Sequence, residues 1–327
     1  MEGIIFKLSI INVIILPTVS ANLLNQLNFY ASQNLFTQQM FQAPFSLENV
    51  MGPSLDMALQ NCQHSFRWQR WNCPSTDFFL RRTSKMLLLD REDAYVTAMV
   101  TAAILYTITK NCSNGLVAEC GCADNSILSQ CSDDPAKSEE LYNKHVSNHF
   151  TDSFADSIKQ HNHKAITNLL RKSLTDQCSC RIMGPAGCIE TVCAKMLRPF
   201  DEIAQDIRHM YDESLQLSDE GINSQVIWKN IPLDAFVYTK DSPNFCEPDA
   251  TPGWNGMRGR HCARISAGAV ATAEERESCR HLCRACGYRV HTENVITEKA
   301  CNCKYTWGGF HVQCGMCVSI ETQHYCF

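Results

Sequence analysis

Cysteine is the residue type through which this chain could do most chemistry, because it accounts for 20 of the 327 residues. A thiol can act as a nucleophile, a metal ligand or half of a disulfide. Two C-x-C pairs, Cys178 with Cys180 and Cys301 with Cys303, are each followed by two further cysteines. Residues i and i+2 of a strand face the same side, so each pair can bridge to a returning strand. The spacing predicts two hairpins, each held by nested disulfides.

Two C-x-x-C motifs, Cys283 to Cys286 and Cys314 to Cys317, leave redox chemistry or a zinc site as alternatives. No parallel-sheet pattern surrounds either motif, and the chain has no G-x-S-x-G or H-E-x-x-H motif. His161 and His163 are interpreted as a solvated pair. We therefore expect a protein that is not an enzyme and that has no cofactor and no metal site.

The first 21 residues have the pattern of a cleaved signal peptide. Lys7 precedes an apolar core from Leu8 to Leu16, and the small residues Ser20 and Ala21 follow. This core is about half as long as the roughly 20 residues that span a bilayer. We expect a secreted, extracellular protein with no stable membrane anchor, whose cysteines form disulfides in an oxidising compartment.

Charge and composition exclude two further classes of protein. The formal net charge of −5, from 29 basic and 34 acidic residues, provides no basic field for a phosphate backbone, so no nucleic-acid partner is expected. The apolar fraction of 45% is too high for a disordered chain.

The cysteines also divide the chain into domains. Ten lie from Cys62 to Cys193 and ten from Cys246 to Cys326, so each half can close its own bridges. The predicted fold class is α+β and disulfide-rich. The predicted segments are a signal peptide (1–21), a flexible lead-in (22–45), a helical domain (46–217) with a hairpin (178–193), a linker (218–245) and a cysteine-rich β domain (246–327) with a second hairpin (301–317).

Three helices are predicted in the first half from their apolar spacing. Asp90 and Asp93 have the spacing of a capping box ahead of a helical apolar series that begins with Ala94 and Tyr95. Pro199 suits the first position of another helix. A third helix is expected near Lys164 to Asp176.

An ordered set of motifs along the chain is similar to that of Wnt signalling proteins. The matching pieces are RWNCP at Arg70 to Pro74, the helix DAYVTAMVTAAILYTITKNCSNG leading to CGC at Cys120 to Cys122, CSC at Cys178 to Cys180, PFDEIAQDIRHMYD from Pro199, DSPNFCEPD from Asp241, and the cysteine-rich tail. The resemblance covers nearly all of the chain after the lead-in. It implies a helical domain carrying a "thumb" hairpin and a cysteine-rich domain carrying an "index finger", which together grip the cysteine-rich domain of a Frizzled receptor in developmental signalling. A co-receptor of the low-density-lipoprotein-receptor-related type is also implied.

The resemblance further implies a disulfide pairing that the sequence alone does not determine. The implied pairs are Cys62–Cys73, Cys112–Cys120, Cys122–Cys131, Cys178–Cys193, Cys180–Cys188, Cys246–Cys286, Cys262–Cys279, Cys283–Cys326, Cys301–Cys317 and Cys303–Cys314.

The thumb loop departs from the Wnt pattern. In typical Wnts a serine in this loop carries a mono-unsaturated acyl chain that fills a groove on Frizzled. Here the loop from Arg181 to Gly187 reads RIMGPAG and has no hydroxyl or amine to take an acyl group. We therefore expect a ligand without lipid. Its predicted receptor contacts in the thumb loop are Ile182, Met183, Gly184, Pro185 and Ala186.

The index finger departs as well, because typical Wnts carry adjacent cysteines at its tip and this chain has Trp307-Gly308-Gly309-Phe310. Gly308-Gly309 suits a two-residue hairpin turn. The predicted receptor contacts are Tyr305, Trp307, Gly308, Gly309, Phe310 and Val312. The alternative is that the aromatic side chains only pack across the hairpin.

Absence of the thumb serine together with the run QRWNCPS resembles the insect branch of the family named Wnt inhibitor of Dorsal. That resemblance implies a feedback inhibitor of Toll/Dorsal signalling. A secreted, non-signalling antagonist that occupies Frizzled or another receptor is the alternative. Asn111 begins the N-x-[ST] motif Asn111-Cys112-Ser113 and is a predicted glycosylation site.

Overall fold

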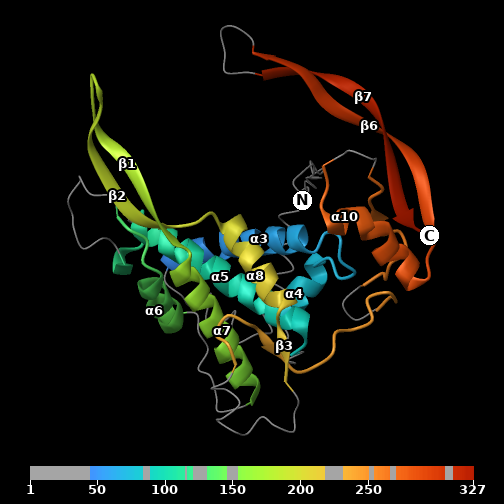
Figure 1. Ribbon diagram of the computed structural model, residues 1–327, viewed down its shortest axis with the longest axis horizontal. Coiled ribbons are helices and arrows are strands. Elements are labelled where there is room, and N and C mark those ends of the chain that lie inside the picture. Colours follow the sequence, from blue (N-terminus) through green and yellow to red (C-terminus); the bar gives the residue numbers. More distant parts are fainter. Residues whose placement is uncertain are drawn as a thin grey trace, which may run out of the picture.

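The computed structural model describes residues 45–83, 89–114, 116–120, 131–145, 154–217, 231–249, 254–265, 270–305 and 312–327. The predicted signal peptide and all but the last residue of the lead-in lie outside these residues. A helical body carries one hairpin, and a smaller cysteine-rich part carries a second (Figure 1). The predicted fold class, α+β and disulfide-rich, is confirmed.

The helical body is organised around one long buried helix, α5. Helices α3, α4, α6, α7 and α8 all pack against it. Its residues Tyr95, Met99, Ile104 and Leu105 are almost completely buried, as expected for a helix that is apolar on every side. The helix bounds are α3 Phe45–Ser65, α4 Ser75–Thr83, α5 Arg91–Ser113, α6 Pro135–His145, α7 Phe154–Lys172 and α8 Phe200–Asp212, with the short turn η1 at Ala118–Cys120.

The predicted cap of α5 is confirmed, and it is also part of a buried charge cluster. Asp90 accepts a hydrogen bond from the backbone N–H of Asp93 at 2.7 Å. The same carboxylate pairs with Arg81, whose guanidinium also contacts Asp77 at 2.8 Å. A single guanidinium therefore holds α4 against the start of α5 by charge-assisted hydrogen bonds.

The first hairpin, or thumb, consists of β1 (Leu174–Gly184) and β2 (Gly187–Leu197). The helix predicted near Lys164 to Asp176 is placed wrongly, because α7 runs from Phe154 to Lys172 and Leu174 already begins β1. Leu174 continues the helical spacing of Ile166 and Leu170, but its backbone pairs with Leu197 of the returning strand. Strand pairing thus overrides the apolar period at this point.

The described half of the predicted linker packs on the helical body. Strand β4 (Val237–Tyr238) pairs in parallel with β3 (Leu215–Gln216), and the preceding Phe236 is fully buried in the helical core. The side chain of Asn162 accepts from the N–H of Val237 at 2.9 Å and donates to its carbonyl at 3.0 Å. The segment is therefore held like an additional strand.

The interpretation of His161 and His163 as a solvated pair is wrong. His161 is only 7% exposed and its Nε2 lies 3.0 Å from the carbonyl of Ala235. The His163 ring stacks on Tyr142. Burial lowers the pKa of both imidazoles. Because α7 begins ten residues earlier than predicted, both residues belong to a packed helix rather than to a loop.

The cysteine-rich domain has a small core in which disulfides replace much of the apolar packing. Met257 and Leu282 are buried among Cys262, Cys279, Cys283 and Cys326. A small core of this kind needs covalent links to be stable. Its elements are β5 His261–Cys262, α10 Ala273–Ser278, η3 Cys279–Cys283, η4 Arg284–Cys286, β6 Val290–Tyr305 and β7 Val312–Cys326, with strand order β5-β7-β6.

Nine of the ten implied disulfides are present among the described residues: Cys62–Cys73, Cys112–Cys120, Cys178–Cys193, Cys180–Cys188, Cys246–Cys286, Cys262–Cys279, Cys283–Cys326, Cys301–Cys317 and Cys303–Cys314. Cys131 is disulfide-bonded as well, and Cys122 lies outside the described residues. In both C-x-x-C motifs the two cysteines belong to different bridges. Neither motif therefore has the free thiols that zinc binding or redox chemistry requires.

Within the described ranges, no helix is long and apolar enough to cross a membrane, and no group of three or more His, Cys, Asp or Glu side chains is arranged to hold a metal ion.

Asp93→Asn is expected to flatten the pH dependence of the free energy of unfolding. Burial, with a contribution from Asp90, raises the pKa of Asp93 to about 6, above the value of about 3.9 in an unfolded chain. The folded chain therefore holds this proton more tightly, and the resulting stabilisation is complete below about pH 4 and is lost as the pH rises through about 6.

At pH 7 the Asn variant should be more stable than the parent by about 1–3 kcal/mol, and at pH 4 the two should be similar. Asparagine keeps the oxygen that accepts from the N–H of Leu89. Denaturant unfolding of the oxidised protein at several pH values measures this, with the exposed Glu213→Gln as the control. Parallel stability profiles of Asp93→Asn and the parent would contradict the assignment.

Candidate functional site

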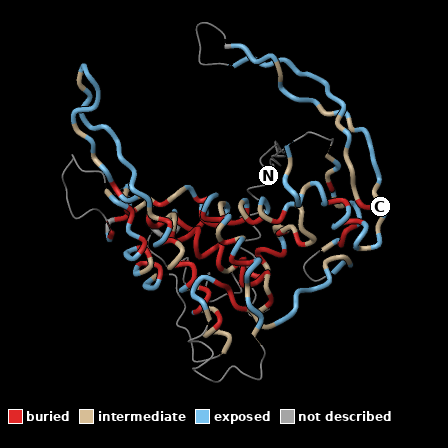
Figure 2. The backbone as a smooth tube through the Cα atoms, in the orientation of Figure 1, coloured by how far each residue is buried: buried red, intermediate tan, exposed pale blue. Residues whose placement is uncertain are grey.

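The two hairpins are the parts of the molecule that project farthest from its packed core. The thumb rises from one end of the helical body. Strands β6 and β7 form the second hairpin, the index finger, which rises from the cysteine-rich domain. Both hairpins reach past the same side of the body (Figure 1). Burial is concentrated in the helices, whereas both hairpins are exposed along most of their length (Figure 2). Residues on these strands are therefore available to a partner.

Two disulfides hold the thumb in place of a core. Cys178 lies opposite Cys193 in the strand register and bonds to it, with a Cα–Cα distance of 4.0 Å. Nearer the tip, Cys180 bonds to Cys188, and the register shifts between Cys180 and Met183. Arg181 and Glu190 form an ion pair across the strands at 3.2 Å.

The thumb tip presents exposed aliphatic side chains. Ile182, Met183 and Ile189 are 46%, 77% and 70% exposed. Gly184 lies under Ile189, because a Cβ added to it would be only 2.6 Å from the Cδ1 atom of Ile189. Gly187 has φ +126°, a conformation that favours glycine. The chain thus turns tightly at Pro185 and Ala186 and directs apolar groups into solvent.

Hydroxyl groups on the thumb lie below its tip. Ser179 is opposite Val192, and Thr191 is opposite Cys180, so both belong to the paired strands. The predicted thumb contacts from Ile182 to Ala186 form the apex as expected, but Ile189 was missed. The sequence feature that could have indicated Ile189 is its position directly after the inner cysteine Cys188, in the strand that returns from the loop.

The predicted contacts at the index-finger tip are only partly described. Residues 306–311, which include Trp307, Gly308, Gly309 and Phe310, lie outside the described residues. The backbone of Tyr305 pairs with Val312, which is 51% exposed. The disulfides Cys303–Cys314 and Cys301–Cys317 lie directly below.

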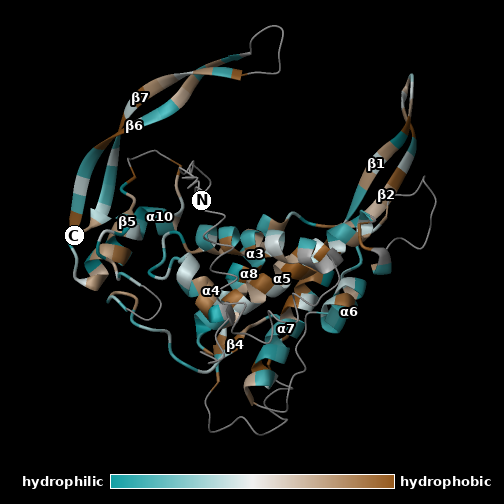
Figure 3. Ribbon diagram, turned by 180° about the vertical axis from the view of Figure 1, so that it is seen from behind, coloured by the Kyte–Doolittle hydropathy of each residue, from teal (hydrophilic) through white to brown (hydrophobic). Residues whose placement is uncertain are grey.

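The index finger also has an apolar face that we had not predicted. Ile296, Met316, Val318 and Ile320 are between 65% and 71% exposed. The register places Ile320 opposite Ile296 and Met316 opposite Ala300, and Glu298, opposite Val318, is the one charged residue between these pairs. The other face is polar and includes a Thr297–Ser319 hydrogen bond and a Lys299–Glu321 ion pair. The alternation of apolar and other residues from Met316 to Ile320 is the sequence signal for this face. Figure 3 shows both hydrophilic and hydrophobic stretches along the hairpin.

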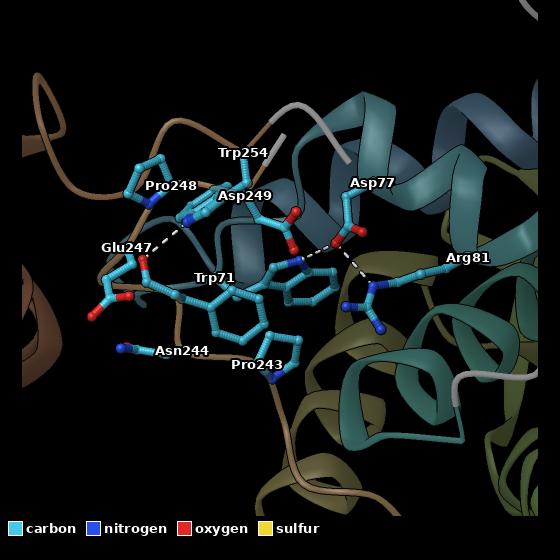
Figure 4. Close-up of a pocket in the computed structure, with 10 residues that line it drawn as sticks. Trp71, Asp77, Arg81, Pro243, Asn244, Glu247, Pro248, Asp249 and Trp254 are labelled. Carbon is cyan, nitrogen blue, oxygen red and sulfur yellow. Dashed lines mark hydrogen bonds and ion pairs between the residues drawn. The ribbon is translucent and has the colours of Figure 1, made fainter. Parts of the chain in front are cut away.

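Where the cysteine-rich domain begins, a cavity of about 310 Å³ lies against the helical body (Figure 4). Trp71 donates from Nε1 to Asp77 at 2.6 Å, and Asp77 also accepts from Arg81. Across the cavity, Trp254 donates from Nε1 to the carbonyl of Phe245 at 3.0 Å. Aromatic rings from both domains thus meet here, and the one buried carboxylate, Asp77, is already paired.

The predicted glycosylation site lies at the end of a helix. Asn111 is in the last turn of α5, and the hydroxyl of Ser113 donates to Asp133 at 2.7 Å. The next residue, Cys112, is held by the bridge to Cys120. Glycosylation of Asn111 stays a prediction.

Comparison with known proteins identifies the family. The model of the wnt family matches residues 32–327. The chain belongs to the Wnt family. The match begins at residue 32, inside the predicted lead-in (22–45), so the similarity to the family extends further toward the N-terminus than the sequence motifs indicate. Wnt-family signalling ligands are not enzymes, and proteins of this family are secreted.

This Wnt is similar to the Wnt inhibitor of Dorsal protein of Drosophila melanogaster, with 44% identity over 88% of this chain and 91% of that protein. It is 28% identical to human Wnt-8b over 92% of this chain and 90% of that protein. The crystal structure of the Drosophila WntD N-terminal domain and linker matches with a TM-score of 0.53 and 40% identity, covering 62% of this chain and all of that one. A structure of human WLS in complex with WNT8A matches with a TM-score of 0.67 and 24% identity, over 89% of this chain and 99% of that chain.

Two glycine substitutions at the thumb tip should have different effects. Gly187→Ala places a Cβ on a residue with φ +126°, which should weaken the local hairpin by about 1–3 kcal/mol. Gly184→Ala should instead push the flexible end of Ile189 aside while leaving the strands paired. Amide hydrogen exchange in β1 and β2 should therefore accelerate about five-fold or more in the first variant.

A shifted Ile189 methyl resonance with nearly unchanged exchange is expected for Gly184→Ala. Equal acceleration in both variants would show that close contact with Ile189, and not backbone conformation, dominates at this turn.

Proposed function

We propose that this chain is a secreted Wnt-type ligand that binds the cysteine-rich domain of a Frizzled receptor without an attached lipid. The supporting observation is the composition of the thumb apex: the loop from Arg181 to Gly187 contains no hydroxyl, and Ile182, Met183 and Ile189 are exposed there instead.

Loss of the acyl chain changes both the affinity and the range of such a ligand. A buried chain contributes about 0.8 kcal/mol per CH₂ group, to a receptor groove or to a membrane. Three aliphatic side chains bury less surface than a long acyl chain. The thumb contact is therefore weaker than in an acylated Wnt, and the ligand diffuses freely because no lipid holds it at membranes.

The index finger supplies the second contact. Its tip residues Tyr305, Trp307, Phe310 and Val312 are proposed to dock on the receptor, with Gly308 and Gly309 forming the turn. The exposed aliphatic face below the tip, from Met316 to Ile320, extends the surface available to the receptor. Apolar side chains that remain exposed on a stable scaffold are typical of a binding surface.

The biological role is proposed as feedback inhibition of Toll/Dorsal signalling. Support comes from the 44% identity to a Drosophila protein whose name describes it as a Wnt inhibitor of Dorsal. A low-density-lipoprotein-receptor-related co-receptor belongs to the same proposal.

The second candidate is a non-signalling antagonist, favoured by the missing acyl group, since a ligand that occupies Frizzled with a weakened thumb contact need not activate it. Pathway output from cells that express single Frizzled types separates the two.

Mass spectrometry of the secreted protein is expected to show a thumb without a fatty acyl group. Binding to the Frizzled cysteine-rich domain should then depend on the aliphatic apex. Met183→Asp and Ile189→Asp should each weaken binding about tenfold, or by about 1.4 kcal/mol.

The matched control is Leu116→Asp, which places the same charge on a 69% exposed aliphatic position outside the strands of both hairpins. Its affinity should equal that of the parent. An acyl group on any thumb residue would disprove the lipid-free proposal, and unchanged affinity of both apex variants would remove the thumb from the receptor contact.

A further inference from the structure

A cavity of about 540 Å³ lies at the base of the index finger and shares no lining residue with the aromatic cavity. The loop after α3 contributes Arg67 and Trp68, the segment around β5 contributes 260–265, and the end of β7 contributes 322–324. Both domains therefore form its walls. It has no place in the proposed Frizzled contact, which uses the hairpin tips.

The charge of this cavity is unusual for a chain with a net charge of −5. Its eleven lining residues include Arg67, Arg260, Arg264, His261 and His324, and none of them carries a carboxylate. None of the three guanidiniums forms an ion pair within the described part of the chain. Positive charge is thus concentrated where nothing in the described fold neutralises it.

Carboxylates on the adjoining strands are already engaged elsewhere. Glu293, which is opposite Gln323 in the sheet, accepts a hydrogen bond from the Tyr325 hydroxyl at 3.2 Å. Glu321 forms its ion pair with Lys299. Neither of these carboxylates lines the cavity.

Arg260 is built into the junction rather than extended into solvent. Its Nη2 donates to the carbonyl of Arg67 at 2.7 Å, whereas its buried Nε has no hydrogen-bond partner among the described residues. Burial lowers the pKa of Arg260 to about 10. A half-buried guanidinium without an anion is costly, so the site gains stability when an anion binds.

Two other side chains are held in position beside it. The guanidinium of Arg67 lies 4.8 Å from the ring centroid of Trp68, a cation–π contact. The Nδ1 atom of His324 and the hydroxyl of Thr292 share a hydrogen bond of 2.9 Å, which leaves Nε2 of His324 for another partner. The exposed Arg264 completes the set.

We propose that Arg67, Arg260, Arg264 and His324 form a binding site, the junction anion site, for a small organic polyanion that carries sulfate or phosphate esters. Guanidinium groups bind tetrahedral oxyanions with paired, charge-assisted hydrogen bonds. A cavity of about 540 Å³ lies in the range of small-molecule sites, about 300–1,000 Å³, and is larger than one inorganic anion requires. Because the walls come from both domains, the ligand also joins them.

Titration calorimetry with the oxidised full chain tests the site. Sucrose octasulfate and inositol hexakisphosphate serve as sulfate-ester and phosphate-ester probes, and sodium sulfate at equal ionic strength is the inorganic comparison. At least one ester probe is expected to bind saturably and more tightly than sodium sulfate, and the tighter of the two identifies the ester. Addition of salt should weaken the binding.

Arg260→Gln combined with Arg264→Gln is expected to weaken the preferred probe about tenfold or more. Arg264→Gln alone provides a variant on an exposed residue if the double variant does not fold, with a smaller loss in the same direction. The control is Arg284→Gln, which removes one charge from an exposed position in the same domain. The ring resonances of His324 should shift in the parent on addition of the probe.

Absence of saturable binding by both esters overturns the proposal, as does equal affinity for esters and inorganic sulfate. If the Arg264→Gln and Arg284→Gln variants bind the probe with equal affinity and the His324 resonances do not shift, the assignment of the site to this cavity is overturned. Frizzled binding is measured separately, through the thumb variants, so failure of either idea leaves the other to be judged on its own result.

Discussion

Cross-strand disulfides are the constraint on which the exposed architecture depends. An isolated two-stranded hairpin is marginally stable in water because it cannot bury enough side chains to offset its lost conformational entropy. In the thumb, Cys178–Cys193 and Cys180–Cys188 supply what packing does not, and Cys301–Cys317 and Cys303–Cys314 do so in the index finger. Because these disulfides stabilise the hairpins, the side chains of the strands do not need to pack in a core and can remain apolar and exposed.

The helical body has the opposite design. Buried α5 contacts nearly every other helix, and its first turn is anchored by the Arg81, Asp77 and Asp90 cluster. Charges that are buried and paired in this way hold the helices in a fixed arrangement, although removing the charges from water costs free energy. The cysteine-rich domain lies between these extremes, with a handful of buried side chains surrounded by bridges.

The features that could be predicted from sequence are those with a local physical cause. The Asp90 cap and the two stapled hairpins follow from the spacing of a few residues. The end of α7 could not be predicted, since Leu174 satisfies both the helix period and the strand, and only its pairing with Leu197 decides between them. The burial of His161 depends on Ala235, which is distant in sequence. In the candidate site, the thumb apex could be predicted from its loop. Ile189 and the aliphatic face of the index finger could not, because they lie on strands whose register decides which side chains share a face.

The length of β6 has a mechanical consequence. Its 16 residues make the index finger a lever about 50 Å long, at about 3.3 Å per residue. A rotation of only about 5° at its base would move the tip by roughly 4 Å, about the distance between neighbouring strands. The gap between the two fingertips is therefore governed less by the fingers than by the stiffness of the joint between the domains. A substitution at that joint can therefore change the gap between the fingertips without altering any residue at either tip.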